Sequence, residues 1–283
     1  MKFLPMAELL GRAFKGGYGV PSFCVWNSDS IELTLRTAAR LKAPVILMSG
    51  PWEFTFTGPR QLGAIAQALA AHYEVRAALH LDHGESLEQV GECLAGGYSS
   101  VMLDFSTRPF EENIQGLQQA VRLARPRGAT VEGELGLIGK VDDLTVEGAE
   151  ESTLTDPAKA AEFVKRSGID ALAVSIGNAH GTYTTLPRLD FERLAQLREC
   201  TGIPLVLHGG SGTPPEDLRK AISLGIAKIN VATEIMNAVR GKLMNDWRDG
   251  KNMWVPIAQA AAMKEAEKVQ EKWIHLTGAA GRG

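Results

Sequence analysis

Eight short runs of apolar, mostly β-branched residues alternate with longer amphipathic segments along this sequence. Strands that alternate with helices pair in parallel, because each helix carries the chain back across the sheet. The runs lack strict alternation of apolar and polar residues, which is typical of strands buried on both faces. Polar side chains also follow six of the runs. These observations predict an α/β fold, a (β/α)8 TIM barrel with a C-terminal helical extension, in preference to a doubly wound parallel sheet.

The expected elements follow one another in regular order. The apolar runs predict strands over Gly19–Val25, Pro44–Met48, Val75–Leu81, Ser99–Leu103, Ala129–Glu132, Ala171–Ile176, Ile203–Leu207 and Ile226–Val231. The amphipathic segments between them predict helices over Ser30–Leu41, Pro59–His72, Ser86–Ala95, Phe110–Arg125, Asp156–Ser167, Asp190–Glu199 and Pro215–Leu224. Ser86 and Asp156 are typical N-cap residues for two of these helices. A final helix is expected from about Ile257 to Trp273.

Composition excludes several classes of protein. The 283 residues are 45% hydrophobic and 22% charged, with a net charge of −3, which is enough chain for one large domain or two small ones. A near-neutral balance does not fit a nucleic-acid binder or a protein of membrane surfaces. Three scattered cysteines do not make a disulfide framework, and no uncharged apolar window of about 18 residues is present. We expect a soluble cytoplasmic protein without nucleic-acid or membrane partners.

Three of the six histidines occupy equivalent places after predicted strands, and each precedes a glycine: His83, His180 and His208. Imidazoles that converge at the carboxyl ends of strands can bind Zn²⁺ and leave a fourth position open for substrate. The alternative is that each ring is satisfied by a backbone carbonyl. The other three, His72, His80 and His275, lack this placement, and we expect them to be structural.

Carboxylates accompany these histidines. Asp82 directly precedes His83, and Asp104 and Glu134 follow the next two strands. Asp82 is either a partner that orients a histidine or a general acid/base beside the metal, and the residues alone leave both open. The glycine-hinged loop from Glu134 to Asp143 is either a mobile lid or a surface loop.

Glycine-rich segments follow the last two strands, His208-Gly209-Gly210-Ser211-Gly212 and Asn230-Val231-Ala232-Thr233. TIM barrels usually hold phosphate at this place, on backbone N–H groups at a helix N-terminus. An ordinary tight turn is the alternative.

Five ordered motifs resemble one enzyme family. They are Leu79-His80-Leu81-Asp82-His83-Gly84, Glu132-Gly133-Glu134-Leu135-Gly136, Ala179-His180-Gly181-Thr182-Tyr183, Leu207-His208-Gly209-Gly210-Ser211-Gly212 and Lys228-Ile229-Asn230-Val231-Ala232-Thr233. The sequence is similar over nearly its whole length to the class II, metal-dependent ketose-bisphosphate aldolases. It most resembles the tagatose-bisphosphate branch, because many fructose-bisphosphate enzymes have Asp in place of Ala232. The resemblance implies one TIM-barrel domain over residues 1–283.

The resemblance also implies chemistry. Such enzymes cleave a ketose 1,6-bisphosphate of tagatose or fructose type by a retro-aldol reaction to dihydroxyacetone phosphate and glyceraldehyde 3-phosphate. Asp82 would handle the proton of the C4 hydroxyl. A catalytic Zn²⁺ ion would be bound by His83, His180 and His208, with Asp104 and Glu134 at an alternative or second metal position. The phosphate would be held by Gly181, Gly209, Gly210, Ser211, Asn230, Val231, Ala232 and Thr233. A response to a monovalent cation and a homodimer or homotetramer are further implications.

Several positions depart from the family pattern. Cys24 stands where relatives have Asn, and we expect it, with Ser49, to touch substrate. Asp142 replaces the usual Glu of the mobile loop as catalytic acid. No arginine is evident for the far phosphate, and Lys264, Lys268 and Arg282 are the candidates.

Alternative functions remain open from the sequence. They are an aldolase for a different phosphorylated ketose, whose aldehyde half is unphosphorylated or differently oxidised, a Schiff-base enzyme using Lys228, and a non-catalytic barrel that supports a partner aldolase.

Overall fold

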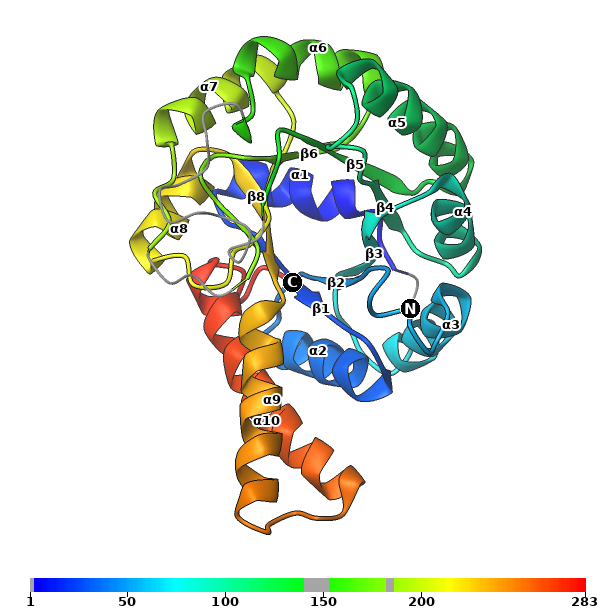
Figure 1. Cartoon of the computed structure of the whole chain (residues 1–283), viewed down its shortest axis with the longest axis vertical. Helices are drawn as coiled ribbons and strands as arrows, with labels where there is room; N and C mark the ends of the chain where they lie inside the picture. Colours follow the sequence, from blue (N-terminus) through cyan, green and yellow to red (C-terminus); the bar gives the residue numbers. More distant parts are fainter. Residues whose placement is uncertain (1–2, 140–152, 182–185) are drawn as a thin grey trace.

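Eight parallel strands close into a barrel in the order in which they occur in the chain (Figure 1). The computed structural model describes residues 3–139, 153–181 and 186–283. The strands are β1 (Val20–Cys24), β2 (Val45–Ser49), β3 (Ala77–Gly84), β4 (Ser100–Leu103), β5 (Thr130–Leu135), β6 (Ala171–Val174), β7 (Leu205–Leu207) and β8 (Ile226–Val231). β8 pairs with β1 and completes the ring. The predicted (β/α)8 barrel is therefore confirmed.

A ring of helices covers the outside of the barrel (Figure 1). They are α2 (Ser28–Arg40), α3 (Pro59–Ala70), α4 (Leu87–Ala95), α5 (Phe110–Ala124) with the short 3₁₀ turn Arg125–Arg127, α6 (Pro157–Ser167), α7 (Phe191–Thr201) and α8 (Pro215–Ser223). The two predicted caps are present. The Ser86 side chain accepts a hydrogen bond from the Gln89 N–H, and the Asp156 side chain accepts one from the Ala158 N–H.

A helix that the sequence analysis did not predict, α1 (Met6–Gly16), closes the amino-terminal end of the barrel. Its buried face consists of Met6, Leu9, Leu10 and Ala13, which recur at helical spacing. These side chains form one cluster with interior strand residues such as Val20 and Ile46. Because α1 precedes the first strand, the alternation of strands and helices gave no indication of it.

The last two helices project from the barrel as a helical hairpin (Figure 1). The unpredicted α9 (Thr233–Arg248) begins directly after β8, and α10 (Val255–Leu276) extends the expected final helix at both ends. The α10 helix returns along α9 and packs on α2, where the Gln270 amide donates to the Thr34 hydroxyl at 2.8 Å. We call the part formed by residues 244–257 the arm.

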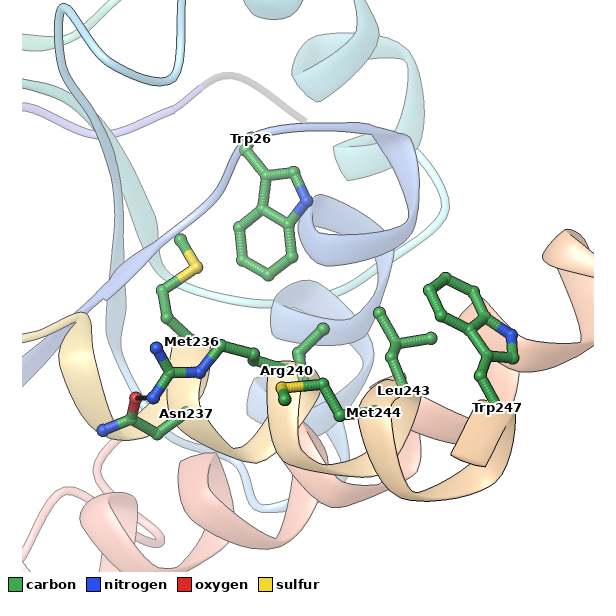
Figure 2. Close-up of a pocket in the computed structure, with 8 residues that line it drawn as sticks. Trp26, Met236, Asn237, Arg240, Leu243, Met244 and Trp247 are labelled. Atoms are coloured by element: carbon green, nitrogen blue, oxygen red, sulfur yellow. Dashed lines mark hydrogen bonds between the residues drawn. The ribbon is translucent and has the colours of Figure 1, made fainter. Parts of the chain in front are cut away.

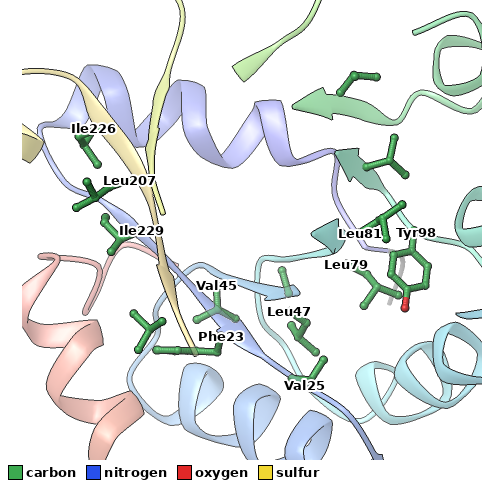
Figure 3. Close-up of a cluster of buried hydrophobic side chains, with 14 of the residues drawn as sticks. Phe23, Val25, Val45, Leu47, Leu79, Leu81, Tyr98, Leu207, Ile226 and Ile229 are labelled. Atoms are coloured by element: carbon green, nitrogen blue, oxygen red, sulfur yellow. The ribbon is translucent and has the colours of Figure 1, made fainter. Parts of the chain in front are cut away.

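Side chains of the strands divide between two cores. Large aliphatic and aromatic residues fill the layer between strands and helices (Figure 3), among them Phe23, Val25, Val45, Leu47, Leu79 and Leu81. Each such side chain contributes about 1.5–3 kcal/mol when fully buried. The barrel interior takes the alternate residues of each strand, which are small and apolar near α1. Toward the carboxyl ends the interior residues become polar, and this gradient places the functional residues.

No helix in the described part of the chain is long and apolar enough to cross a membrane.

Candidate active site

An irregularity in β3 brings two consecutive polar residues to the carboxyl-terminal mouth of the barrel. Strict alternation would put Asp82 inside the barrel and His83 outside it. The register with β4 shifts between Leu81 and Gly84, and His83 has a φ of 47°, a left-handed conformation that non-glycine residues rarely adopt. His83 thereby turns inward beside Asp82, so this backbone distortion is part of the site.

Three imidazoles from different strand ends meet at this mouth. His83 is the next-to-last residue of β3, His180 lies beyond β6, and His208 directly follows β7. His83 Nε2 lies 2.8 Å from His208 Nδ1, and one ring nitrogen from each of the three residues lies within 4.8 Å of the others. The Nε2 atom of His180 is buried and has no hydrogen-bond partner. The structure thus brings together the three histidines that the sequence singled out.

Two carboxylates fix the orientation of two of these rings. Asp104 Oδ2 accepts a hydrogen bond from His83 Nδ1 at 2.7 Å, and Glu132 Oε1 accepts one from His208 Nε2 at 2.8 Å. With these hydrogen bonds made, the remaining ring nitrogens, His83 Nε2 and His208 Nδ1, face each other at 2.8 Å, and each can bind a metal ion when it carries no proton. The sequence analysis missed Glu132. Its position two residues before Glu134 on the same face of β5 was the available signal.

The three nitrogens fit a divalent metal ion. Two nitrogens at about 2.0–2.1 Å from a tetrahedral Zn²⁺ are about 3.4 Å apart. This value lies between the 2.8 Å that separates His83 Nε2 from His208 Nδ1 and the upper limit of 4.8 Å for the group. An unpartnered buried nitrogen is costly unless something binds it, and a cation removes that cost for His180. Three histidines also leave a fourth coordination position for substrate.

Burial and neighbouring charges set the proton affinities of the rings. Burial, with the adjacent His208 and His83, lowers the pKa of His180 to about 3, so its lone pair is free at neutral pH. Burial also lowers the pKa of His208. Burial opposes protonation of His83, but Asp82 and the hydrogen bond to Asp104 outweigh it and raise the pKa of His83 to about 10. A metal ion has to displace that proton.

Asp82 lies beside the histidines without orienting them. Its Oδ2 is 4.0 Å from His83 Nε2, beyond hydrogen-bond distance, and its Oδ1 accepts a hydrogen bond from the Asn230 amide at 2.9 Å. The Lys228 ammonium lies 3.7 Å from the same Oδ1. His83 and Lys228 outweigh the effect of burial and hold the pKa of Asp82 far below its usual range. Asp82 is thus held by Asn230 and Lys228 and makes no hydrogen bond to His83.

Below the mouth, the barrel interior contains a buried polar network. Lys228 Nζ donates to Glu132 Oε2 at 2.8 Å and lies 3.1 Å from His80 Nε2. Burial opposes ionisation of Glu132, but Lys228 and His208 lower its pKa to about 2. Burial and the Lys228 charge lower the pKa of His80 to about 3. His80 lies within β3, as expected, and shares the interior face with Asp82.

Asp104 and Glu134 form a second potential ligand group with His83, again with one atom from each residue within 4.8 Å of the others. Both oxygens of Asp104 already accept hydrogen bonds, from His83 and from Ser106. Glu134 Oε2 is buried without a hydrogen-bond partner and lies 3.9 Å from His208 Nδ1. Burial and Asp104 raise the pKa of Glu134 to about 8, so this carboxyl can hold a proton at neutral pH.

The two glycine-rich segments pack against one another at the ends of β7 and β8. Gly209 has a φ of 62°, and a Cβ there would lie 2.0 Å from the Ala179 carbonyl oxygen. The Gly210 N–H donates to the Asn230 carbonyl at 3.0 Å, and the Ser211 hydroxyl accepts from the Glu234 N–H at 3.2 Å. These glycines are therefore required for close packing of the loops.

The predicted phosphate residues divide into two groups. Ala232 and Thr233 stand at the start of α9, a helix N-terminus that favours anions, and Gly181 (φ 115°) follows His180. Val231 is different. Its side chain is buried in the layer between strands and helices, since it alternates with the interior residue Asn230. The Val231 side chain is thus not placed to contact a ligand at the mouth.

Of the two further substrate candidates, only one faces the mouth. Cys24, the last residue of β1, is buried, and its thiol donates to Glu53 Oε1 at 3.3 Å. The Ser49 hydroxyl instead lies 2.8 Å from the Tyr98 hydroxyl, beneath the helices. Alternation along β2 turns Met48 inward and Ser49 outward, which corrects the prediction for the Ser49 side chain.

The other sequence candidates lie elsewhere. Asp142 falls outside the described residues. The Arg282 guanidinium lies 5.5 Å from the centre of the Tyr18 ring, at the amino-terminal end of β1 and opposite the mouth. The prediction that Arg282 binds the far phosphate of a substrate in its own chain is therefore corrected. Lys264 and Lys268 are exposed on α10, and Lys268 pairs with Glu265 at 2.7 Å. A cavity of about 430 Å³ lies between Trp26 and α9 (Figure 2), and none of the three clustered histidines lines it.

Comparisons with known proteins agree with the fold. The profile of the family described as "Fructose-bisphosphate aldolase class-II" matches residues 4–282. The YdjI aldolase from Escherichia coli K12 is 33% identical, with 99% of each chain covered and a TM-score of 0.87. A candidate fructose-1,6-bisphosphate aldolase from Coccidioides immitis is 29% identical, with 97% of this chain and 96% of that chain covered and a TM-score of 0.85.

A more distant structure, the fructose-bisphosphate aldolase from Campylobacter jejuni, shares the fold at 22% identity, with 100% of this chain and 97% of that chain covered and a TM-score of 0.82. The profile match and the YdjI comparison each extend over nearly the whole chain. This chain belongs to the class II fructose-bisphosphate aldolase family.

Proposed function

We propose that this chain is a zinc-dependent lyase that cleaves a ketose 1-phosphate between C3 and C4, releasing dihydroxyacetone phosphate and an aldehyde. One observation carries the proposal. Three imidazole nitrogens converge beside the ionised carboxylate of Asp82, and the Nε2 atom of His180 is buried without a hydrogen-bond partner. Family membership supports the aldol reaction and a divalent metal, and three nitrogen ligands favour Zn²⁺.

In this proposal His83, His180 and His208 hold the ion. When bound, the ion supplies a Lewis acid that polarises the ketone oxygen at C2. Asp82 takes the proton of the C4 hydroxyl, and the electrons of the C3–C4 bond pass to C3 as C4 becomes the aldehyde carbon. A proton then returns to C3, which completes dihydroxyacetone phosphate. The ketose 1-phosphate is thus divided into dihydroxyacetone phosphate and an aldehyde, with no net gain or loss of atoms. We keep Asp142 as the proposed donor of that proton.

The phosphate of dihydroxyacetone phosphate would lie between the ends of β7 and β8. The start of α9 supplies N–H groups and the positive end of the helix dipole, and Gly181, Gly209, Gly210 and Ser211 border it. Asn230 would contact the substrate while its amide holds Asp82. We keep Asp104 and Glu134 as the proposed ligands of an alternative or second metal position.

The family resemblance suggests tagatose- and fructose-type 1,6-bisphosphates as the first substrates to test, with another phosphorylated ketose as the alternative. The Schiff-base alternative is disfavoured because Lys228 is fully buried and ion-paired with Glu132. A purely supporting barrel has no need for three converging histidines. We also propose a single domain and a homo-oligomer, in which exposed apolar residues of the arm, such as Trp254 and Ile257, would be covered.

The test is metal removal followed by an activity assay on a panel of ketose mono- and bisphosphates. We expect EDTA to abolish release of dihydroxyacetone phosphate and Zn²⁺ to restore it. Full activity in chelator, with borohydride trapping at Lys228, would overturn the proposal. Asp82→Ala should lose most turnover and retain its zinc. Loss of zinc with turnover per metal unchanged would instead make Asp82 an orienting residue.

A further inference from the structure

Glu53 places a carboxylate at the mouth of the barrel that the proposed reaction does not use. It lies in the loop after β2 and reaches toward the end of β1. Its Oε1 accepts a hydrogen bond from Cys24 Sγ at 3.3 Å, and its Oε2 accepts one from the Gly50 N–H at 2.8 Å. Gly50 in turn packs on β3, where a Cβ would lie 2.6 Å from the Asp82 carbonyl oxygen. Glu53 therefore lies at the ends of β1 and β2, and at Gly50 its Oε2 comes close to the backbone of Asp82, since the same Cβ would lie 3.5 Å from that oxygen.

The charge of Glu53 adds to that of Asp82 at this point. Burial, then Glu53 and Asp82, raise the pKa of the Cys24 thiol well above its usual value, so the thiol stays neutral. Cys24 therefore does not offset either carboxylate. The Lys228 ammonium, 3.7 Å from Asp82 Oδ1, compensates part of the Asp82 charge, whereas the contacts of Glu53 described here are with a neutral thiol and a backbone N–H. Glu53 therefore makes the ends of β1 and β2 acidic.

The proposed function, on which this inference rests, limits which part of a substrate can meet the ends of β1 and β2. The phosphate on C1 lies at β7 and β8, and the C4 hydroxyl lies at Asp82 on β3. Carbons beyond C4 then continue past Asp82. They pass either over β1 and β2, where Glu53 lies, or over β4 and β5, where Asp104 and Glu134 lie. Described carboxyl groups border both directions.

We propose that Glu53 selects an aldehyde half that carries hydroxyl groups and no phosphate, so that the substrate is a ketose 1-phosphate with an uncharged tail. A phosphate next to Glu53 and Asp82 would place like charges together, which is unfavourable. A carboxylate has about four lone-pair positions, and Glu53 uses two of them in the contacts described here. The others can accept hydrogen bonds from hydroxyl groups of a polyhydroxy aldehyde.

The experiment compares two aldehydes in the condensation direction. Dihydroxyacetone phosphate is offered with D-glyceraldehyde or with D-glyceraldehyde 3-phosphate, and kcat/KM is measured for each aldehyde. We expect the zinc-loaded wild type to favour the uncharged aldehyde by about tenfold or more, the size of one moderate charge repulsion. Glu53→Gln, which removes the charge at constant shape, should reduce that ratio by about tenfold.

A matched control separates this local effect from a change of net charge. Glu88→Gln alters an exposed glutamate in the first turn of α4, at the same end of the barrel, and should leave the ratio unchanged. If Glu53→Gln does not fold, the wild type still tests the proposal. Salt screens charge repulsion, so its preference for the uncharged aldehyde should fall as ionic strength rises.

Two results would overturn the inference. One is a wild-type preference for glyceraldehyde 3-phosphate, and the other is the same ratio in Glu53→Gln as in wild type. Exchange of a carbon-bound proton of dihydroxyacetone phosphate with D₂O needs no aldehyde and monitors the proposed function separately. Absence of exchange in the wild type would refute the proposed function. Normal exchange with the wrong aldehyde preference would refute only the role of Glu53.

Discussion

The Nζ atom of Lys228 lies 2.8 Å from Oε2 of Glu132 in the interior of the barrel, where neither side chain is exposed. The other oxygen of Glu132 accepts the hydrogen bond from His208. Through Glu132, a lysine on β8 thus acts on the orientation of His208, a proposed metal ligand directly after β7. An isolated ion in the barrel interior would be strongly unfavourable, so the pair is stable only when complete.

We expect Lys228→Met to lower the free energy of unfolding by about 3–5 kcal/mol, because it leaves the Glu132 carboxylate buried without its cation. Adding Glu132→Gln to this variant should restore part of the loss, since no charge then remains uncompensated. Urea unfolding of both single variants and the double variant measures the coupling. Strictly additive losses would show that the ion pair is not an energetic unit.

Glu132→Gln alone should weaken zinc binding by about 10–100-fold, because the Gln amide can no longer hold His208 as a negatively charged acceptor. Competition with a chromophoric chelator measures the affinity. Glu192→Gln, the same change on the exposed surface of α7, is the control and should bind zinc like the wild type. Equal zinc affinities in the wild type, Glu132→Gln and Glu192→Gln would show that Glu132 does not support metal binding.

Gly209→Ala should destabilise the fold more than Gly202→Ala does. Both glycines have nearly the same left-handed conformation, with φ of 62° and 65°, so the backbone strain of alanine is shared and amounts to about 1–3 kcal/mol. At Gly202 a Cβ would meet open space, whereas at Gly209 it would strike the Ala179 carbonyl oxygen.

The clash at Gly209 also pushes the loop that carries His180 away from His208. We therefore expect Gly209→Ala to lose zinc affinity, while Gly202→Ala retains it. Urea unfolding and zinc titration of the two variants test this difference. Similar behaviour in both assays would contradict the steric argument.

Trp247→Glu should dissociate the proposed homo-oligomer. Trp247 is 44% exposed on α9, close to exposed Met244 and at one end of the cavity in Figure 2. Burying a new charge in an apolar interface is unfavourable. Light scattering coupled to size-exclusion chromatography reports the mass. Leu123→Glu, at a residue 37% exposed on α5, is the control, and dissociation by both variants would argue against an interface at the arm.

The sequence by itself determined the barrel and the three histidines. Alternation of apolar runs with amphipathic segments specifies βαβ units, and His83, His180 and His208 are visible because each follows a strand end. It did not determine α1, which lies outside that alternation and whose position depends on small interior residues such as Ala78 and Ala173. The predicted strands also ended before the observed carboxyl ends of β3 and β5, so Glu132 was not recognised as an interior residue beneath the histidines.

Only the tertiary structure decided which side of each strand a residue occupies. A one-residue shift inverts inside and outside. The bulge in β3 turns His83 inward, and regular alternation turns Ser49 and Val231 outward. The contacts of Asp82, Glu132 and Glu53 join strand ends or loops that are distant in the sequence, and closure of the barrel brings them together. Local residue patterns specify elements, whereas the register of the closed sheet specifies which polar groups meet.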